Sequence, residues 1–333
     1  MTKAGFWTKK ISPSIFATLF FAPVYFAEAQ QPAKIPRVTY LSAASAPSQS
    51  SRVEAFRQGL LELGYVEGKN IVIEYRYAEG KPDRLKEIAA ELVRLNVYII
   101  ISGGPAATRS AKEATVTIPI VMGFDNDPVG SGFIASLARP SGNITGLSSL
   151  APELSGKQLE LLKETVPRLS RVAVLGTSTE PGYTQVLKEM ELAAGALGLQ
   201  LQRGEVRDPK DIDTVLQQGS KGRAEAILVL AGPIVFSNRK QVVELAIKRR
   251  LPAIYYVPEF VEAGGLMIYG VSIPHLFRRA ATYVDKILKG RKPADLPVEQ
   301  PMKFEFIVNL NAAKQIGLTI PPNVLVRADR VIK

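Results

Sequence analysis

The chain of 333 residues contains no cysteine and a single histidine, His275. The absence of cysteine excludes a disulfide framework, a thiolate nucleophile and a cysteine-ligated zinc site. A single histidine excludes a histidine-rich metal site. A Ser-His-Asp triad could use only His275, which follows Pro274 at an expected helix start. The phosphate-loop pattern G-x-x-x-x-G-K-[ST] and the nucleophile elbow G-x-S-x-G are also missing. We therefore expect no catalytic residue, no bound metal and no cofactor.

Long apolar runs are absent too, and the longest near the start is Ile15–Phe26. This run is shorter than the roughly 20 residues of a membrane-spanning helix. Three lysines precede it, and Ala27-Glu28-Ala29 follows it, which is the order of a secretory signal. We expect residues 1–29 to be a signal peptide cleaved after Ala29, and the mature protein to be periplasmic. Because no cysteine follows, no lipid anchor is expected.

The remaining composition is that of a folded protein, with 46% apolar and 22% charged residues. The length predicts about two domains. The net charge of +11 raises the question of nucleic-acid binding. However, basic clusters such as Lys248-Arg249-Arg250 fall at the ends of expected helices, where cations complement the helix dipole. No basic strand with interleaved aromatic residues accompanies them, so we expect no nucleic-acid partner.

After the leader, expected strands and helices alternate. Amphipathic helices are predicted at Arg52–Leu63, Pro82–Leu95, Pro105–Ala114 and Asp127–Leu137. In the last of these, Asp127 is the expected N-cap and Pro128 lies in the first turn. The strands expected between them are Val38–Leu41, Asn70–Arg76, Val97–Ile101, Ile118–Met122 and Asn143–Leu147. Strands that alternate with helices predict a parallel sheet covered on both faces.

The same pattern then begins again. Arg37 to Gly64 spans 27 positions, and so does Arg171 to Gly198. Each of these segments runs from a strand through an amphipathic helix to a Leu-Gly stop. The repeat is one of architecture more than of sequence, and it predicts an α/β protein with two doubly wound, Rossmann-like lobes. The tail from Gly265 onward is not a third copy, and its length allows it to cross between the lobes.

Ligands of open parallel sheets bind outside the carboxyl ends of the strands. This rule predicts one cleft between the lobes, lined by Ser42, Ser45, Tyr77, Gly103, Gly104, Ala106, Ala107, Asp125 and Asp127 from the first, and by Thr177, Ser178, Tyr183, Gly232, Tyr255 and Tyr256 from the second.

The segment Gly103–Ala107 is the most informative of these. Two glycines end a buried strand, and a helix begins at Pro105, so free backbone N–H groups can bind a carboxylate or phosphate. A plain strand-to-helix turn is the alternative. Asp125 and Asp127 can accept hydrogen bonds from a ligand amine. For Asp127 the alternative is that it only caps the expected helix. The tyrosines can stack on a ligand ring or only close the rim of a core.

Residues 130–135 match G-x-G-x-x-A, the dinucleotide-binding pattern. In that pattern the glycines belong in a strand-to-helix turn, with an acidic residue at the end of the next strand. Here the expected helix already begins at Asp127, and the next expected strand ends in Ser148-Ser149-Leu150. We expect no nicotinamide cofactor.

Several ordered stretches resemble a family of bacterial ABC-transporter substrate-binding proteins that includes tryptophan- and tyrosine-type uptake proteins. The matching stretches are residues 51–60, 63–65, 67–68, 70–71, 78–80, 127–132, 138–140, 142–146, 153–157, 262–266, 269–270 and 318–321. The resemblance runs from about residue 37 to the C-terminus. It implies a type I periplasmic-binding fold with three hinge strands, in which Gly103–Ala107 lies where relatives hold a carboxylate. Relatives that bind amino acids often carry an Asp-Asn pair where this chain has Ala231-Gly232-Pro233, so the ammonium partner expected there is missing.

The expected lobes are residues 36–147 plus 272–300 and residues 148–271 plus 301–333. The expected function is that of a monomeric, non-enzymatic receptor that closes on a small, carboxylate-bearing solute. Its partners would be a membrane permease and the cytoplasmic ATPase of the importer. Two alternatives remain at this stage: a periplasmic sensor that acts on a receptor kinase, and an enzyme for nucleotide sugars on the same two-lobed fold.

Overall fold

The first sheet has five parallel strands in a doubly wound order. A computed structural model describes residues 1–2, 4–5 and 35–333, so most of the expected signal peptide lies outside the described residues. The strands are arranged in the order β2 (Val72–Tyr77), β1 (Arg37–Ser42), β3 (Ile99–Ser102), β4 (Ile120–Asp125) and β5 (Ile144–Ser148). The apolar run of β3 is fully buried, as a central strand covered on both faces requires.

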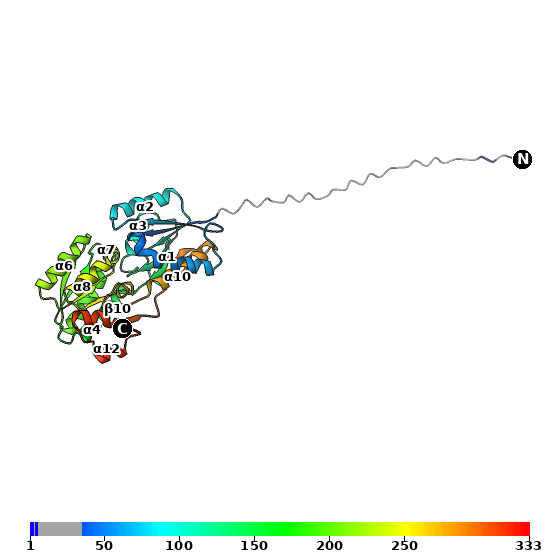
Figure 1. Ribbon diagram of the computed structural model, residues 1–333. Helices are drawn as coiled ribbons and strands as arrows, with labels where there is room; N and C mark the ends of the chain where they lie inside the picture. The colour runs from blue at the N-terminus through cyan, green and yellow to red at the C-terminus, as the bar shows by residue number, and fades with distance from the viewer. Residues whose placement is uncertain (3, 6–34) are drawn as a thin grey trace. The chain divides into compact units, whose positions relative to one another are not determined.

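Helices cover both faces of this sheet. One face carries α2 (Pro82–Arg94) and α3 (Pro105–Ala114), and the other carries α1 (Ser50–Glu62), which follows the short η1 (Ala46–Gln49). Beside α1 lies α10 (Ile273–Leu288), which comes from much later in the chain (Figure 1). The two pack so closely that a Cβ on Gly59 would lie 2.4 Å from the carbonyl oxygen of Arg278. The Tyr65 hydroxyl also donates to Asp285 Oδ1 at 3.0 Å.

The second sheet has seven strands. Their order is β12 (Arg330–Ile332), β11 (Glu305–Asn309), β10 (Met267–Gly270), β9 (Ala253–Tyr255), β8 (Ala226–Val229), β6 (Arg171–Gly176) and β7 (Gln200–Glu205). All neighbouring pairs are parallel except β10 and β11. Apolar side chains of α4 (Ala151–Thr165) and α5 (Tyr183–Leu197) belong to one buried cluster, whereas those of α6 (Pro209–Lys221) and α8 (Arg239–Lys248) belong to another.

The remaining short elements lie at strand ends and in the tail. They are α7 (Pro233–Ser237), α9 (Glu259–Glu262), η2 (Pro293–Asp295), α11 (Leu310–Ile316) and α12 (Pro322–Val326). No helix among the described residues has the length and apolarity needed to span a bilayer. The described residues likewise contain no group of three or more His, Cys, Asp or Glu arranged to hold a metal ion.

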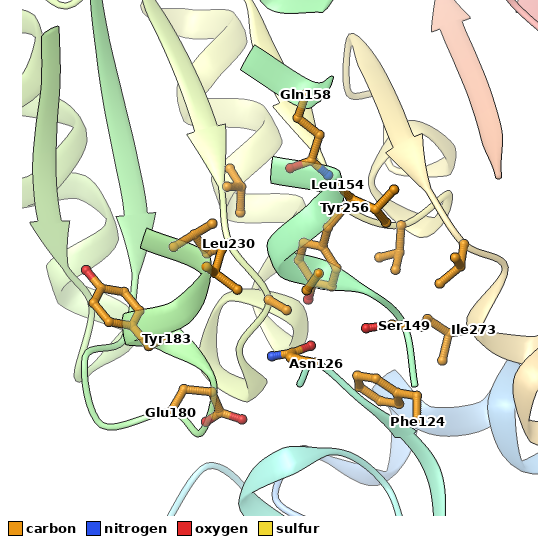
Figure 2. Close-up of a pocket in the computed structure, with 16 residues that line it drawn as sticks. Phe124, Asn126, Ser149, Leu154, Gln158, Glu180, Tyr183, Leu230, Tyr256 and Ile273 are labelled. Carbon is orange, nitrogen blue, oxygen red and sulfur yellow. The ribbon is translucent and has the colours of Figure 1, made fainter. Parts of the chain in front are cut away.

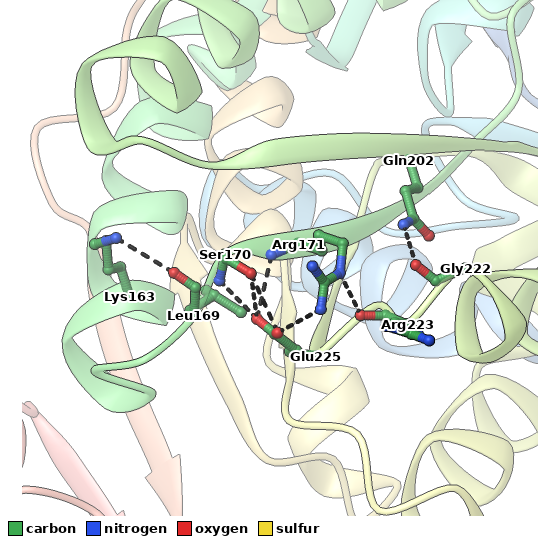
Figure 3. Close-up of polar contacts among 8 residues, drawn as sticks. All are labelled: Lys163, Leu169, Ser170, Arg171, Gln202, Gly222, Arg223 and Glu225. Carbon is green, nitrogen blue, oxygen red and sulfur yellow. Dashed lines mark hydrogen bonds and ion pairs between the residues drawn. The ribbon is translucent and has the colours of Figure 1, made fainter.

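Charge-assisted hydrogen bonds fix the amino ends of the central strands in the second lobe (Figure 3). Glu225, just before β8, accepts from the backbone N–H of Ser170 at 2.6 Å and from Arg171 Nη2 at 2.9 Å. The hydrogen bond from the Ser170 backbone is the main cause that holds the pKa of Glu225 below its ordinary value. One carboxylate thus ties the starts of β6 and β8 together at the end of the sheet opposite the expected cleft.

The chain crosses between the lobes three times. It passes from β5 to α4 at Ser149–Leu150 and from β10 to α10 at Val271–Ser272. It returns after Glu299, which pairs beside Leu147, to enter β11. The fold is therefore the α/β pair of doubly wound lobes with a multi-strand hinge that the alternating pattern predicts.

The expected helix at Asp127–Leu137 is wrong. Residues 127–139 form turns and bends, and no helix lies between β4 and β5. Asp127 Oδ1 accepts from the backbone N–H of Gly130 at 2.8 Å, the contact that an N-cap makes, but no helix follows it. Gly132 then adopts φ +70°, a left-handed conformation that ends any helical course.

Candidate functional site

The carboxyl ends of the parallel strands of both lobes face each other across two adjoining pockets. Counting the space open to solvent, one pocket measures about 600 Å³ and the other about 400 Å³. Both are lined by residues of each lobe, and the residues they share are Phe124, Asn126, Glu180, Ala231 and Tyr256. The larger is called the apolar pocket below and the smaller the polar pocket, after the side chains that line them.

The apolar pocket is built mainly from aliphatic and aromatic side chains, with a few polar groups, such as Gln158 and Glu180, on different sides of it (Figure 2). Phe124 comes from β4 of the first lobe, and Tyr183 opens α5 of the second. Gln158 of α4 donates to the backbone carbonyl of Tyr269 at 2.8 Å, which fixes its amide at the wall. The apolar lining is completed by Leu154, Val186, Val229, Leu230, Val257, Val271 and Ile273. A pocket of this make-up takes an apolar body and orients it with few polar contacts.

The polar pocket contains the glycine turn between β3 and α3. Gly104 has φ +138°, and a Cβ there would lie 3.1 Å from the ring of Phe124. A Cβ on Gly103 would lie 2.9 Å from the Cβ of Ser42. Both positions therefore require glycine, which lets the backbone at the start of α3 approach the pocket closely.

Two polar side chains of the segment that begins α1 complete this pocket. Arg52 is 3% exposed, with its guanidinium carbon 3.9 Å from the ring centre of Phe236 and 5.2 Å from that of Phe124. Its Nε lies 4.0 Å from Oε1 of the buried Glu259 in the second lobe. Gln49 is fully buried, and its Oε1 accepts from the Tyr40 hydroxyl at 2.7 Å. The pocket thus holds a desolvated cation between two aromatic rings.

The loop between β6 and α5 brings a carboxyl group of the second lobe into the same place. Glu180 lines both pockets and accepts from the backbone N–H of Ala106, in the first turn of α3. Burial raises the pKa of Glu180 to about 7, against the lowering effects of that hydrogen bond and of Arg109. Arg109 also donates to the carbonyl of Thr179 at 2.9 Å. The lobes therefore touch through this loop on one side of the cleft.

Two further hydrogen bonds cross between the lobes. Gln185 of α5 donates to the carbonyl of Gly130 at 2.7 Å, and the backbone N–H of Ser45 donates to Ser237 Oγ at 3.4 Å. With the Glu180 contact, they place the lobes in a closed arrangement.

The structure places many of the predicted cleft residues together at the site. Tyr256 lines both pockets, and Tyr183 lines the apolar one. Thr177 lies farther out, in a third hollow that it shares with Ala106 and Glu180. The polar pocket is also lined by Ser42, Gly103, Gly104, Ala106, Ala107 and Gly232.

Besides Thr177, six predicted residues line neither of the two pockets. Tyr255 is buried and stacks on Phe260 with ring centres 4.7 Å apart, and Tyr77 packs against Tyr40 at 6.1 Å. Asp125 is fully buried below the site, where burial raises the pKa of its carboxyl well above the ordinary value. The remaining three form hydrogen bonds away from the pockets: Ser45 with Ser237, Asp127 with Gly130, and Ser178 with Glu205.

The strand-end rule covers the segments 123–127 and 176–183, which hold Phe124, Asn126 and Glu180. The polar and aromatic lining residues outside the segments that it covers are Gln49, Arg52, Ser149, Gln158 and Phe236. A signal for Arg52 is present in the sequence. It lies four positions before Phe56 and eight before Leu60, on the buried face of an amphipathic helix. A charged residue at such a position needs a partner or a ligand, because buried charges are rarely left alone.

Comparison with known proteins agrees with this architecture. The chain is 24% identical over 272 residues to a tyrosine-binding protein of Clostridioides difficile (strain R20291), covering 82% of this chain and 78% of the relative. It is 28% identical to a conserved domain protein of Vibrio cholerae, with a TM-score of 0.85 over 90% of this chain and 100% of that one. An ABC domain from Streptococcus pneumonia in complex with L-Trp is 26% identical, with a TM-score of 0.83 over 89% and 99% of the two chains.

More distant periplasmic binding proteins, at 14–16% identity, share the fold alone, which is the type I periplasmic-binding fold. The sequence profile of the family described as "ABC transporter substrate binding protein" matches residues 37–332 of the 333-residue chain. On this match and on the two-lobed architecture, the chain belongs to the family of ABC transporter substrate-binding proteins.

Proposed function

We propose that this chain is the extracytoplasmic receptor of an ABC importer and that it traps a small, carboxylate-bearing solute by hinge closure. The observation that carries the proposal is the pair of adjoining pockets, whose shared lining comes from both lobes. Only the closed arrangement brings Phe124 of the first lobe opposite Tyr256 of the second. A ligand that contacts both lobes therefore favours the closed form by the free energy of the contacts that the open form lacks.

The same proposal covers the protein's location, partners and lobes. The signal peptide at residues 1–29 directs the chain to the periplasm, where it acts as a monomer without a lipid anchor and without enzymatic activity. The closed form then docks on a membrane permease driven by a cytoplasmic ATPase. The rigid bodies of the movement are residues 36–147 plus 272–300 and residues 148–271 plus 301–333.

Relatives support the class of solute. The names of two of them record binding of tyrosine and of L-Trp, both of which carry a carboxylate and an aromatic ring. The pockets of this chain offer a polar end and an apolar end of matching character.

Dye labelling tests the closure directly, because the chain has no native cysteine to interfere. Cysteines at Glu87 on α2 and Thr214 on α6, both exposed and on different lobes, carry a donor and an acceptor dye. The panel of solutes contains amino acids, aromatic acids, nucleosides and small peptides. We expect at least one carboxylate to raise energy transfer between the dyes and to be recovered unchanged. A panel that leaves the transfer unaltered, or a solute that is converted to product, contradicts the proposal.

A further inference from the structure

The polar pocket contains two buried hydrogen-bond donors whose bonding capacity the protein does not use. In the described part of the chain, Arg52 Nε and Gln49 Nε2 have no hydrogen-bond partner. Arg52 is 3% exposed and Gln49 is 0% exposed, so water does not replace the missing partners freely. A buried donor left unpaired is destabilising, and more so when it is charged. Both side chains line the same pocket.

The orientation of Gln49 follows from its neighbour. The Tyr40 hydroxyl donates to Gln49 Oε1, which identifies that atom as the acceptor and leaves Nε2 as the donor of the amide. Tyr40 is itself fully buried between β2 and α10 neighbours, so this orientation is held from behind. The donor is thus fixed in place before any ligand arrives.

The counter-ion of Arg52 leaves its guanidinium available. Glu259 approaches Nε only to 4.0 Å, and neither of its oxygens has a hydrogen-bond partner within the described residues. The pair balances charge across the two lobes without forming the bidentate contact that arginine and a carboxylate make at shorter range. Glu259 does not line the polar pocket, whereas Arg52 does.

The glycine turn between β3 and α3 has fewer free backbone N–H donors than the sequence predicts. Its helix-terminal N–H at Ala106 already donates to the carboxyl group of Glu180, a side chain of the opposite lobe. This N–H is therefore not available to an incoming acid group in the closed form. Within the described chain, Arg52 Nε and Gln49 Nε2 are the fully buried side-chain donors of this pocket that have no hydrogen-bond partner.

We propose that Arg52 and Gln49 bind the acid group of the ligand and that the adjoining apolar pocket holds its body. This inference rests on the proposed function and narrows the ligand to a carboxylate with an apolar or aromatic body. The planar guanidinium and the amide N–H together match the two oxygens of a carboxylate. Phe124 lines both pockets, so it contacts the ligand where the acid group joins the body.

The probe is 3-phenylpropanoate, with its uncharged analogue 3-phenylpropanamide, titrated by calorimetry into the full mature chain. We expect the carboxylate to bind and the amide to bind at least tenfold more weakly. Arg52→Gln should weaken carboxylate binding by about 10- to 100-fold, the range for a lost charge-assisted hydrogen bond. It should leave binding of the amide within about threefold. Gln49→Leu should weaken carboxylate binding by a smaller factor in the same direction.

A matched control and two companion variants separate binding from folding. Arg57→Gln lies on the same helix but is half exposed, and it should leave the affinity unchanged. Arg52→Gln leaves the buried carboxylate of Glu259 without its counter-ion, which can destabilise the fold. The double variant Arg52→Gln/Glu259→Gln removes both charges, and we expect it to lose the preference for the carboxylate over the amide as well. Glu259→Gln alone should tighten carboxylate binding, because it removes a competing negative charge. A purely structural ion pair would instead alter stability without altering affinity.

The outcomes are decisive in each direction. The proposal is overturned if the folded double variant binds 3-phenylpropanoate as the wild type does, or if the wild type fails to prefer it over the amide. Failure of the proposed function has a different signature: no solute of the panel then changes energy transfer between the labelled lobes, whatever Arg52 contributes to affinity. Carboxylate-driven closure that needs no more ligand in Arg52→Gln than in the wild type leaves the receptor function intact and rejects only the anchor.

Discussion

At the scale of single residues, two carboxyl groups lie where their charged forms are disfavoured. Burial raises the pKa of Glu180 to about 7 and holds the pKa of Asp125 well above its ordinary value. In the unfolded chain both groups have ordinary pKa values near 4. Between those values and the raised ones, the folded protein holds protons that the unfolded chain has released. The free energy of unfolding must therefore fall as the pH rises through this interval.

We predict that the free energy of unfolding decreases between about pH 5 and pH 7, measured by urea denaturation at constant ionic strength. Glu180→Gln should flatten part of this slope, because the amide still accepts from Ala106 without titrating. Asp125→Asn should reduce the pH dependence of the free energy of unfolding as well. Glu87→Gln, an exposed site on α2, serves as the control and should leave the profile as it is. A Glu180→Gln profile that coincides with the wild type would show that the carboxyl is not held in this environment.

Residues at strand ends are the part of the site that the sequence predicts well, since the position of a strand end follows from its apolar run. Side chains that reach the site from elsewhere are harder to foresee. Gln158 reaches the apolar pocket from within α4, away from any strand end. Arg52 depends on where α1 packs relative to Phe236, a contact between residues 184 positions apart. No local pattern encodes such distances.

At the scale of secondary-structure elements, the close approach of α1 and α10 depends on one missing side chain. Gly59 faces the backbone of α10, and an added Cβ would lie 2.4 Å from the Arg278 carbonyl oxygen and 2.9 Å from the Cβ of Ala281. The neighbour is backbone, so a rotamer change cannot relieve the clash. The two helices would have to separate, and the core between them would loosen.

We predict that Gly59→Ala lowers the free energy of unfolding by about 1–3 kcal/mol, the usual cost of overpacking. Gly195 in α5 offers the matched control, since nothing lies within 4 Å of an added Cβ there. Because alanine favours helix over glycine, Gly195→Ala should raise stability by about 0.5–1 kcal/mol. Chemical denaturation of the two variants measures both values. A stabilising Gly59→Ala would mean that α1 and α10 are not in this contact.

Most elements are recoverable from the spacing of apolar residues, and α3 begins and ends where the sequence predicts. The failed helix at 127–137 shows the limit of that method. Asp127-Pro128 has the chemistry of a helix start, and Asp127 makes the expected bond to the Gly130 N–H, but the chain turns away at Gly132 before a helix forms. Local preferences allow both outcomes, and the packing of Phe133 and Ile134 into the first lobe decides between them.

At the scale of the whole molecule, the two lobes are not independent. Three segments of chain join them, and one cluster of buried apolar side chains includes Phe56 of the first lobe as well as Phe260 of the second. Arg52 extends this contact by lying between Phe124 and Phe236. Disrupting one lobe in the closed form therefore exposes apolar surface of the other.

We predict a single cooperative unfolding transition for both lobes, measured by scanning calorimetry of the mature chain. The calorimetric enthalpy should equal the van't Hoff enthalpy, as for a two-state protein. The double variant Arg52→Gln/Glu259→Gln should retain one transition, because the apolar contacts remain. Two resolved transitions in the wild type would contradict the coupling.

The late position of α10 has a consequence for the order in which the protein is made. The first sheet is complete at Ser148, yet the helix that covers α1 and one sheet face ends only at Leu288. At a synthesis rate of about 5–20 residues per second, the ribosome needs on the order of ten seconds to supply it. During that interval the nascent amino-terminal half has an uncovered hydrophobic surface and cannot reach its native packing. The export proposed above requires an unfolded chain at the membrane, and this delay favours that state.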